Sequence, residues 1–317
     1  MGRCRMNDFL LAGMVAAERL PAAHSSKPNV LSELKNSLAG ANGEQRTAAL
    51  LKRELDLPGK AIFLNDVHIP YKDGTAQIDL LLVHEELVCV LEVKNMVGEF
   101  YFDSVNFQFH RIVDGRREGM RNPEAQLHRA VRAASGFLGV PVHGVIVLAS
   151  RSGKVVEAPK HYPVVSLDYL PFHLEGLAQG SKLFDAPALA SKLEALPVHN
   201  SSRHWLERHN ITFDSLRLGV TCPTCRTRSL EWQERKWCCA GCGFYSRDAH
   251  RVTLQEYALL FGGELDTGTA YRLLGIKNKY ILYRLLEKTA LQSGKRGTRR
   301  IVEDRDLLRD YFGRVYR

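Results

Sequence analysis

The stretch QIDLLLVHEELVCVLEVKN, from Gln77 to Asn95, decides how the first half of this chain folds. Two apolar runs flank a polar segment at His84–Glu86, a pattern that predicts two neighbouring strands joined by a tight turn. Both strands are apolar enough to lie inside a protein. They nevertheless contain Asp79, Glu92 and Lys94, and burying an unpaired charge is costly. These three side chains therefore need partners.

The alternation of side chains along a strand places the three charged residues on one face. Residues two apart project to the same side, so Glu92 and Lys94 point together, with their backbones about 7 Å apart. Asp79 belongs to the preceding strand and shares its face with Leu81 and Val83. Because both of those neighbours are apolar, we expect this face of the sheet to be mostly buried.

Upstream of these strands, a predicted helix carries a carboxylate at the head of an apolar face. The segment GANGEQRTAALLKREL predicts a helix that begins at Asn42 or Gly43 and ends near Leu55, after a loop at His24–Asn29. At helical spacing Glu44 is followed by Ala48, Leu51 and Leu55. Glu44 is therefore expected to point at the sheet.

A second predicted helix presents an amide in the same way. The segment NPEAQLHRAVRAASGFL predicts a helix with Asn122 as its N-cap and Pro123 in its first position. Its apolar stripe begins at Gln126 and continues through Ala130, Ala133 and Phe137. Gln126 is therefore also expected to point at the sheet.

Five polar residues thus converge in the predicted fold. A divalent cation held by Asp79, Glu92 and Glu44 would give the carboxylates a partner, and Mg²⁺ or Mn²⁺ suits such oxygen ligands. The cation could activate a water for attack on a phosphate. Lys94 would orient that water or stabilise negative charge, and Gln126 would hydrogen-bond the water or a phosphate. The alternative is structural, with a Glu92–Lys94 salt bridge at a strand end and Asp79 capping a turn.

The order of predicted elements indicates an α/β or α+β fold. Strands are predicted in PGKAIFLNDVHIPY, in a meander after Lys94, and in VPVHGVIVLAS and HYPVVSLDYL. The 317 residues exceed what one small core organises. We predict an N-terminal helical segment, an α/β domain, a helical linker, a cysteine-rich unit and a basic helical unit, at residues 1–37, 38–173, 174–214, 215–250 and 251–317.

Four motifs, GANGEQ, QIDLLLV, LEVKN and NPEAQ, occur in an order that resembles the nuclease-related domain family, usually called NERD. That family belongs to the PD-(D/E)xK nuclease superfamily. The resemblance covers about residues 38–150 and implies a restriction-endonuclease-like core with a mixed central sheet flanked by helices. The family's functional residues fall on Glu44, Asp79, Glu92, Lys94 and Gln126. The tryptophan that tends to follow the ExK strand in the family is replaced by Phe102, Phe107 and Phe109.

Four of the seven cysteines form two CxxC pairs with thirteen residues between them. The pairs are Cys222 with Cys225 and Cys239 with Cys242. This spacing is typical of a zinc ribbon, in which two knuckles deliver four thiolates to one structural Zn²⁺. The remaining cysteines, Cys4, Cys89 and Cys238, are predicted to be non-ligands. The ribbon could contact nucleic acid or serve only as a staple, and the sequence favours neither.

The C-terminal segment has the pattern of a helix-turn-helix followed by a wing. A short helix is predicted at Thr267–Leu274, a turn at Gly275 and a second helix at Ile276–Lys288. The inner face of the second helix is predicted to contain Ile276, Tyr280, Tyr283, Leu286 and Glu287. The stretch LQSGKRGTRRIV predicts a hairpin, so that we expect a winged-helix-like domain.

Positive charge is concentrated in this segment. Residues 251–317 hold 14 Lys and Arg against 8 Asp and Glu, a net charge of +6 out of +9 for the whole chain. Phosphate contacts are the natural explanation, although a helical protein-interaction module is an alternative. The residues predicted to bind nucleic acid are Lys277, Asn278, Lys279, Lys295, Arg296, Arg299 and Arg300.

The sequence also predicts where the protein acts. No apolar stretch approaches the ~18 residues that span a bilayer. Arg3 and Arg5 before Phe9–Ala17 mimic a signal peptide, but Glu18 and Arg19 follow directly, which favours a helix. The CxxC pairs fit a reducing compartment, so we expect a cytoplasmic protein.

Two main hypotheses follow for function. The first is a metal-dependent nuclease that hydrolyses phosphodiester bonds of DNA and is targeted by the ribbon and the basic C-terminal unit. The second is a catalytically silent DNA-binding accessory protein, and a weaker third is a protein-binding adaptor. DNA or RNA, duplex or single strand, and endo- or exonuclease action all remain open. Because many nucleases of this superfamily pair subunits, a homodimer is one expectation.

Overall fold

The computed structural model describes residues 7–315 except 179, 181, 198–202, 227, 228, 288, 290 and 294–297. The chain forms two compact units. Unit 1 combines Met1–Ser37 with Asn200–Arg317, and unit 2 is the segment Leu38–His199 between them. Unit 2 is therefore inserted between two segments that fold together.

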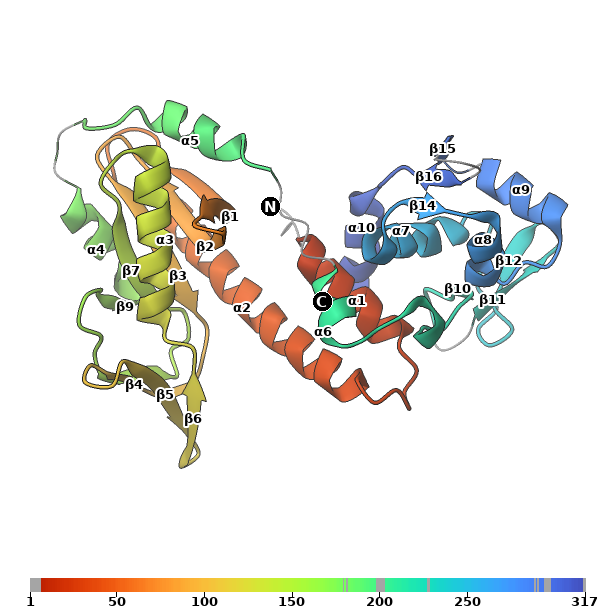
Figure 1. Cartoon of the computed structure of the whole chain (residues 1–317), viewed down its shortest axis with the longest axis horizontal. Coiled ribbons are helices and arrows are strands. Elements are labelled where there is room, and N and C mark those ends of the chain that lie inside the picture. Colours follow the sequence, from red (N-terminus) through yellow and green to blue (C-terminus); the bar gives the residue numbers. More distant parts are fainter. Residues whose placement is uncertain are drawn as a thin grey trace. The chain divides into compact units, whose positions relative to one another are not determined.

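A five-stranded mixed sheet forms the centre of unit 2 (Figure 1). The strand order is β1-β2-β3-β7-β9, with the bounds Ile62–Tyr71, Gly74–Val83, Val88–Lys94, His143–Leu148 and Val164–Ser166. β1, β2 and β3 are antiparallel, whereas β3, β7 and β9 run parallel. The predicted mixed central sheet is confirmed, and the strand pair predicted within residues 77–95 lies at its centre.

Helices cover both faces of this sheet. α2 (Lys27–Glu54) packs Ala48 and Leu51 against one face, which is formed by Leu80, Leu82, Leu91, Val145 and Val147. α3 (Pro123–Leu138) packs Leu127 and Ala130 against the opposite face, which includes Leu81, Val83, Val90 and Ile146. The apolar stripes predicted for both helices therefore do face the sheet.

α2 is longer than its sequence pattern predicts. The predicted start at Asn42 or Gly43 is wrong, because the helix begins at Lys27 and includes the second half of the predicted loop. Pro28 lies in the first turn, where its missing backbone N–H removes no helical hydrogen bond. Gly40 and Gly43 are accommodated inside the helix.

The meander predicted after Lys94 forms a second sheet of unit 2. Its order is β6-β5-β4-β8, with the bounds Arg116–Met120, Gln108–Val113, Gly98–Asp103 and Gly153–Glu157. Phe102 and Phe109 are buried, with ring centroids 4.6 Å apart, whereas Phe107 is 71% exposed. Two of the three phenylalanines in the region of the family's tryptophan thus contribute to the core.

Short helices follow the two sheets of unit 2 and lead into unit 1. Within the segment 174–214, which the sequence predicts to be a helical linker, short helices alternate with loops, and the first of these helices begins at Leu170. The elements are η1 (Leu167–Tyr169), α4 (Leu170–Leu177), α5 (Ala186–Glu194), α6 (His204–Arg208) and η2 (Phe213–Ser215).

The N-terminal helix α1 (Asp8–Arg19) is part of the core of unit 1. Leu11, Met14 and Val15 are completely buried. α1 packs against α6, against α7 (His250–Phe261) and against α10 (Arg305–Val315). The apolar run that mimics a signal peptide is thus a helix whose apolar residues are buried among C-terminal helices.

An ion pair between Arg19 of α1 and Glu256 of α7 stabilises the packing of these two helices. Both side chains are buried, and Arg19 Nε donates to Glu256 Oε2 at 3.0 Å. Arg19 also donates to the backbone oxygen of Gly219 at 2.6 Å and to the hydroxyl of Thr253 at 3.1 Å. Because the guanidinium has many partners, the buried charge is compensated.

A four-stranded antiparallel sheet follows in unit 1. Its order is β10-β11-β12-β13, with the bounds Val220–Thr221, Ser229–Gln233, Lys236–Cys238 and Tyr245–Ser246. The four paired cysteines lie on and around these strands. This sheet corresponds to the predicted ribbon.

The remaining elements have the order of a winged helix. After α7 come β14 (Glu264–Leu265), α8 (Thr267–Leu274), α9 (Lys279–Glu287), β15 (Leu291–Ser293) and β16 (Arg299–Ile301). The strands form one antiparallel sheet in the order β14-β16-β15. Gly275 ends α8 with φ of 67°, a conformation that glycine adopts without strain. The predicted helix-turn-helix and hairpin are therefore present.

α9 differs from its prediction in register and orientation. It begins at Lys279 rather than Ile276, and its buried residues are Leu282, Leu285 and Leu286. Tyr280 and Tyr283 were predicted to face inward, but they are 68% and 39% exposed. The prediction was wrong because the three leucines form the buried side of the helix, so that the two tyrosines lie on its outer side.

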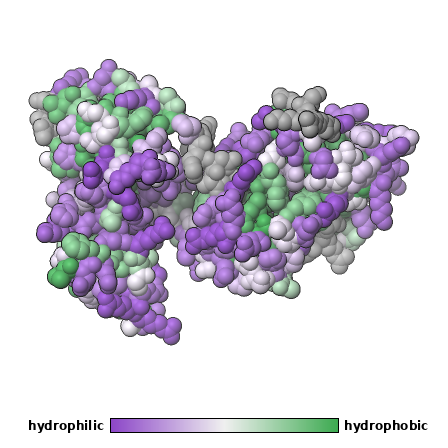
Figure 2. All heavy atoms as spheres, viewed as in Figure 1, coloured by the Kyte–Doolittle hydropathy of each residue, from purple (hydrophilic) through white to green (hydrophobic). Residues whose placement is uncertain are grey.

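Most of the visible surface of both units is hydrophilic (Figure 2). Hydrophobic side chains gather at the end of unit 2 where α5 lies, and again near β4. Among the helices that the structure describes, none combines the length and the apolar character needed to cross a membrane.

Replacing Arg19 with Met should destabilise unit 1 by about 3–5 kcal/mol, because Glu256 would be left buried without its cation. Urea unfolding followed by tryptophan fluorescence measures this effect, since Trp205, Trp232 and Trp237 all belong to unit 1. The double variant Arg19→Met/Glu256→Met removes both charges and should recover most of the loss. A single variant as stable as the wild type would contradict the importance of this pair.

Candidate active site and zinc cluster

The two central strands separate where their charged residues begin. The β2–β3 ladder pairs Val83 to Leu80 with Val88 to Leu91. Beyond it β2 stays paired with β1, while Glu92 and Lys94 in β3 pair with β7. The backbone N–H of Val93 donates instead to Asp79 Oδ2 at 3.0 Å. The carboxylate of Asp79 thus replaces the backbone oxygen that a neighbouring strand would offer to this N–H, at the point where the pairing of β2 with β3 ends.

Glu92, Lys94 and Gln126 form a hydrogen-bonded row beside this opening. Glu92 is only 4% exposed, and its Oε1 lies 2.6 Å from Lys94 Nζ. Lys94 Nζ also donates to Gln126 Oε1 at 3.3 Å. Gln126 is held in the first turn of α3, whose N-cap Asn122 accepts a hydrogen bond from the backbone N–H of Glu124. The strand and the helix thus bring together three of the five predicted residues.

Electrostatics place Glu44 in the same group. Burial, followed by repulsion from Asp66, raises the pKa of Glu44 to about 7. Burial, followed by repulsion from Glu92, raises the pKa of Asp79 to about 8, and Glu44 contributes to this shift. Burial by itself would lower the pKa of Lys94, but the neighbouring carboxylates of Glu92, Asp79 and Glu44 outweigh it and raise this pKa. Lys94 is therefore held in its charged form, as a cation among these carboxylates.

A close approach of α2 to the end of β3 brings Glu44 to this position. A Cβ atom on Gly43 would lie 2.6 Å from Asn95 Cβ, so only glycine fits there without a shift. Arg46 Nη2 donates to Asn95 Oδ1 at 2.8 Å, and Asn95 Nδ2 donates to the backbone oxygen of Ala39 at 2.7 Å. Glycine and asparagine thus anchor the helix beside the predicted site.

Asp66 is a further carboxylate of this region that sequence analysis missed. In β1 it lies between the pairs Asn65–Leu80 and Val67–Ile78, and is therefore opposite Asp79. Its φ is 51°, and its Oδ1 accepts a hydrogen bond from Gln77 Nε2 at 2.8 Å. The signal was an acidic residue inside an apolar strand, as at Asp79.

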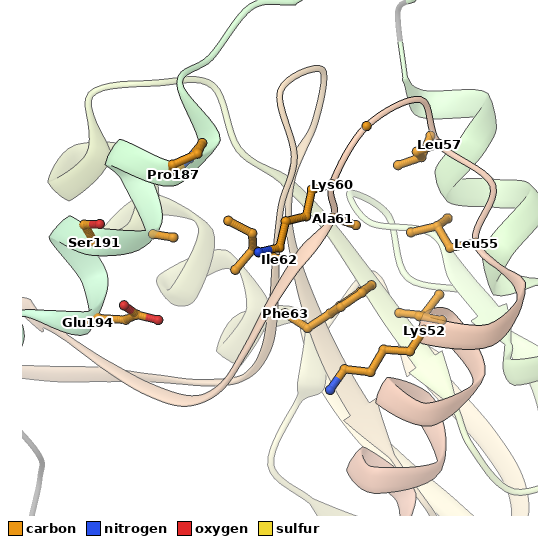
Figure 3. A pocket seen from close by; sticks show the side chains of 13 residues that line it. Lys52, Leu55, Leu57, Lys60, Ala61, Ile62, Phe63, Pro187, Ser191 and Glu194 are labelled. Atoms are coloured by element: carbon orange, nitrogen blue, oxygen red, sulfur yellow. The ribbon is translucent and has the colours of Figure 1, made fainter. Parts of the chain in front are cut away.

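A cavity of about 640 Å³ lies elsewhere in unit 2, at the edge strand β1 (Figure 3). Lys52 of α2 and Glu194 of α5 flank it on either side of Ile62 and Phe63. None of the five predicted site residues lines this cavity. The predicted site residues therefore lie apart from this pocket, at the end of β3.

The four predicted zinc ligands come together in unit 1. The Sγ atoms of Cys222, Cys225, Cys239 and Cys242 all lie within 4.8 Å of one another. Two of the Sγ pairs are 3.6 Å apart, close to the ~3.8 Å edge of a tetrahedron with Zn–S bonds of ~2.3 Å. Backbone N–H groups of residues 242 and 241 lower the pKa of Cys239, which favours its thiolate form. This cluster is consistent with a structural Zn²⁺.

The other cysteines do not join this cluster. Cys89 is buried in β3, and Cys238 is only half-buried, but neither belongs to the metal-binding group among the residues that the structure describes. Cys4 lies outside the described residues.

Five of the seven predicted nucleic-acid-binding residues lie in the described part of the chain, at the start of α9 and in β16. Lys277, Asn278 and Lys279 are exposed at the start of α9, and Asn278 Oδ1 accepts a hydrogen bond from the backbone N–H of Tyr280 at 2.9 Å. Arg299 and Arg300 belong to β16. Lys295 and Arg296 lie outside the described residues.

Comparison with known families agrees with the geometry of unit 2. Residues 39–149 match the family model of NERD, the nuclease-related domain. No curated protein and no solved structure matches the chain. The chain therefore contains a NERD domain, followed by a four-cysteine ribbon and a helical C-terminal region, and a nuclease-related function is implied.

Replacing Gly43 with Ala should destabilise unit 2 by about 1–3 kcal/mol, because the new methyl group overlaps Asn95. Gly40→Ala is the matched control, since nothing lies within 4 Å of its Cβ position in the same helix. Removing that glycine should stabilise the helix by about 1 kcal/mol. Thermal unfolding of both variants compares the two effects, and equal changes would contradict the proposed close approach.

Divalent-cation binding to this cluster should strengthen as the pH rises from about 6 to about 8. Below these values Glu44 and Asp79 retain protons that a cation must displace, because their pKa values are raised to about 7 and about 8. Calorimetric titration with Mn²⁺ at several pH values measures this dependence. Binding that does not change with pH, or that survives in Asp79→Asn, would argue against a metal at these carboxylates.

Proposed function

We propose that this protein is a metal-dependent nuclease that hydrolyses phosphodiester bonds of DNA. The observation that carries the proposal is the row formed by Glu92, Lys94 and Gln126 beside Asp79, within the matched NERD domain. A buried salt bridge alone needs neither the amide of Gln126 nor two further acidic groups whose pKa values are raised. Such a concentration of perturbed groups is typical of active sites.

The donor types suit a hard divalent cation, although among the described residues only the four cysteines form a preassembled group of three or more metal-ligating side chains. Glu44, Asp79 and Glu92 offer carboxylate oxygens, the ligands that Mg²⁺ and Mn²⁺ prefer. Burial, followed by repulsion from neighbouring carboxylates, raises the pKa values of Glu44 and Asp79, and a bound cation would favour their charged forms. A cation held there would supply Lewis acidity toward a phosphate and a water.

The remaining chemistry belongs to Lys94 and Gln126. An ammonium group has three donors, of which one contacts Glu92 and one contacts Gln126. The third can donate to a phosphate oxygen or to an attacking water, where it would stabilise developing negative charge. Because Gln126 accepts through Oε1, its amide N–H groups can hold the substrate in place.

We further propose that the C-terminal unit delivers DNA to this site. The basic residues of α9 and β16 lie on elements that have the order of a winged helix, and residues 251–317 carry a net charge of +6. Binding through such charges is sensitive to salt. The ribbon would brace this unit.

Cleavage of labelled linear, circular and single-stranded DNA by the full chain tests the enzyme. We expect cutting with Mg²⁺ or Mn²⁺ and none with EDTA. Lys94→Ala should lower the rate by about 10²–10³-fold, because the charge-stabilising donor is lost. Lys154→Ala, an exposed lysine on β8 of the same unit, is the matched control and should retain full activity.

A second variant guards against misfolding of Lys94→Ala, which leaves Glu92 buried without its cation. Gln126→Ala removes a half-buried amide and should lower cleavage while thermal unfolding stays unchanged. If no condition supports cutting while salt-sensitive DNA binding persists, the protein is instead a silent DNA-binding accessory factor.

A further inference from the structure

The outer side of α9 carries two exposed tyrosines, Tyr280 and Tyr283. Tyr280 is 68% exposed and Tyr283 is 39% exposed, while the leucines on the other side of the helix form its core contacts. Lys279 Nζ lies 5.1 Å from the centroid of the Tyr280 ring, and Arg299 Cζ lies 5.5 Å from the centroid of the Tyr283 ring. These four residues are called the tyrosine face.

The charge of this surface identifies the class of partner. Between residues 277 and 287, α9 and its start carry Lys277, Lys279 and Arg284 against the single acidic residue Glu287. Arg300 is exposed on the neighbouring β16. Exposed aromatic rings set among cations match an anionic ligand that also has flat apolar surfaces, and nucleic acid has both properties.

Exposed tyrosine rings favour unpaired bases over paired bases as the ligand. In a duplex the base faces are stacked, and only their edges are accessible, mainly to Arg, Lys, Asn and Gln. A tyrosine ring gains most from the face of a base, which is accessible only in an unpaired strand. Residues three apart on a helix are neighbours, about 5–6 Å between Cβ atoms, so Tyr280 and Tyr283 can serve one continuous strand.

We infer that the tyrosine face binds unpaired nucleotides of single-stranded DNA by stacking. The inference rests on the proposed DNA-binding role of the C-terminal unit and names the form of its substrate. The rings would stack on bases, while Lys279 and Arg299 neutralise the adjoining phosphates. The winged-helix-like elements would then bind a single strand and would not recognise base edges in the major groove of a duplex.

A groove of about 580 Å³ lies between the start of α9 and the ribbon, and none of the four residues of the tyrosine face lines it. Lys277 and Asn278, at the start of α9, line it together with Trp232 of β11. Trp232 is half-buried and packs edge-to-face on the buried Trp237, with centroids 5.2 Å apart. A strand that continues from the tyrosine face into this groove would therefore meet a third aromatic side chain beside Lys277, with Glu231 as the acidic residue of the lining.

The ribbon side of this groove is held against α9. Trp237 Nε1 donates to His250 Nδ1 at 3.2 Å, and His250 Nε2 lies 3.3 Å from the backbone oxygen of Leu285 in α9. Burial lowers the pKa of His250 to about 4, so that the ring is neutral at pH 7 and can accept from Trp237 while donating to Leu285. The groove is thus a built feature of unit 1.

Binding of the full chain to fluorescein-labelled oligothymidylate of about 20 nucleotides, compared with a duplex of equal length, tests the inference. We expect tighter binding of the single strand. Tyr280→Ala and Tyr283→Ala should each weaken it about tenfold, whereas Tyr280→Phe and Tyr283→Phe should retain it because the ring remains. Equal losses with Ala and Phe would assign the tyrosines to phosphate contacts and overturn the stacking role.

Tyr245 provides the matched control. It is also 68% exposed, and Lys236 Nζ lies 5.2 Å from its ring centroid, but it belongs to β13. Tyr245→Ala should leave binding unchanged. A loss equal to that of Tyr280→Ala, or a clear preference of the wild-type protein for duplex, would overturn the assignment to α9.

Intrinsic fluorescence locates the strand independently. Trp205 and Trp237 are almost completely buried, so quenching by oligothymidylate should come from Trp232 and should disappear in Trp232→Phe. Binding of oligothymidylate to the wild-type protein without any quenching would exclude the groove from the binding surface. These experiments measure no cleavage, so a failed nuclease assay with intact strand binding would overturn the enzyme and leave this inference standing.

Discussion

The burial of Glu92 is the constraint on which the candidate site depends. Its carboxylate lies in the middle strand of the central sheet, almost out of contact with water, so it requires a cation within reach. Lys94 meets this need from the same strand because residues two apart share a face. Asp79 and Glu44 add two further acidic groups, whose pKa values are raised first by burial and then by neighbouring carboxylates. The proposed metal would favour the charged forms of these groups.

Two local devices make this arrangement possible. The pairing of β2 with β3 ends at Leu80 and Leu91. The carboxylates of Asp79 and Glu92 therefore lie where these two strands are no longer paired with each other. Helices approach the opening from both faces, α3 with Gln126 in its first turn and α2 with Gly43 against Asn95. Each helix contributes one polar group at the end of an otherwise apolar stripe.

Unit 1 depends on a contact between the two ends of the chain. α1 fills the core beside α7 and α10, and its buried Arg19 is neutralised by Glu256. The ribbon joins the same body through the Trp237–His250 hydrogen bond. The ribbon and α9 are therefore held in fixed positions within unit 1, so a surface that both of them form has a fixed shape.

Local pattern determined much of this protein: the alternation of residues 77–95, the cap at Asn122 and the spacing of the cysteines lead directly to the central strands, α3 and the metal cluster. Only the tertiary structure decided the start of α2, the contribution of Asp66 and the exposure of Tyr280 and Tyr283. The physical reason is the range of the interactions. Periodicity and capping act within a few residues, whereas strand register and helix packing join distant segments that no local pattern specifies.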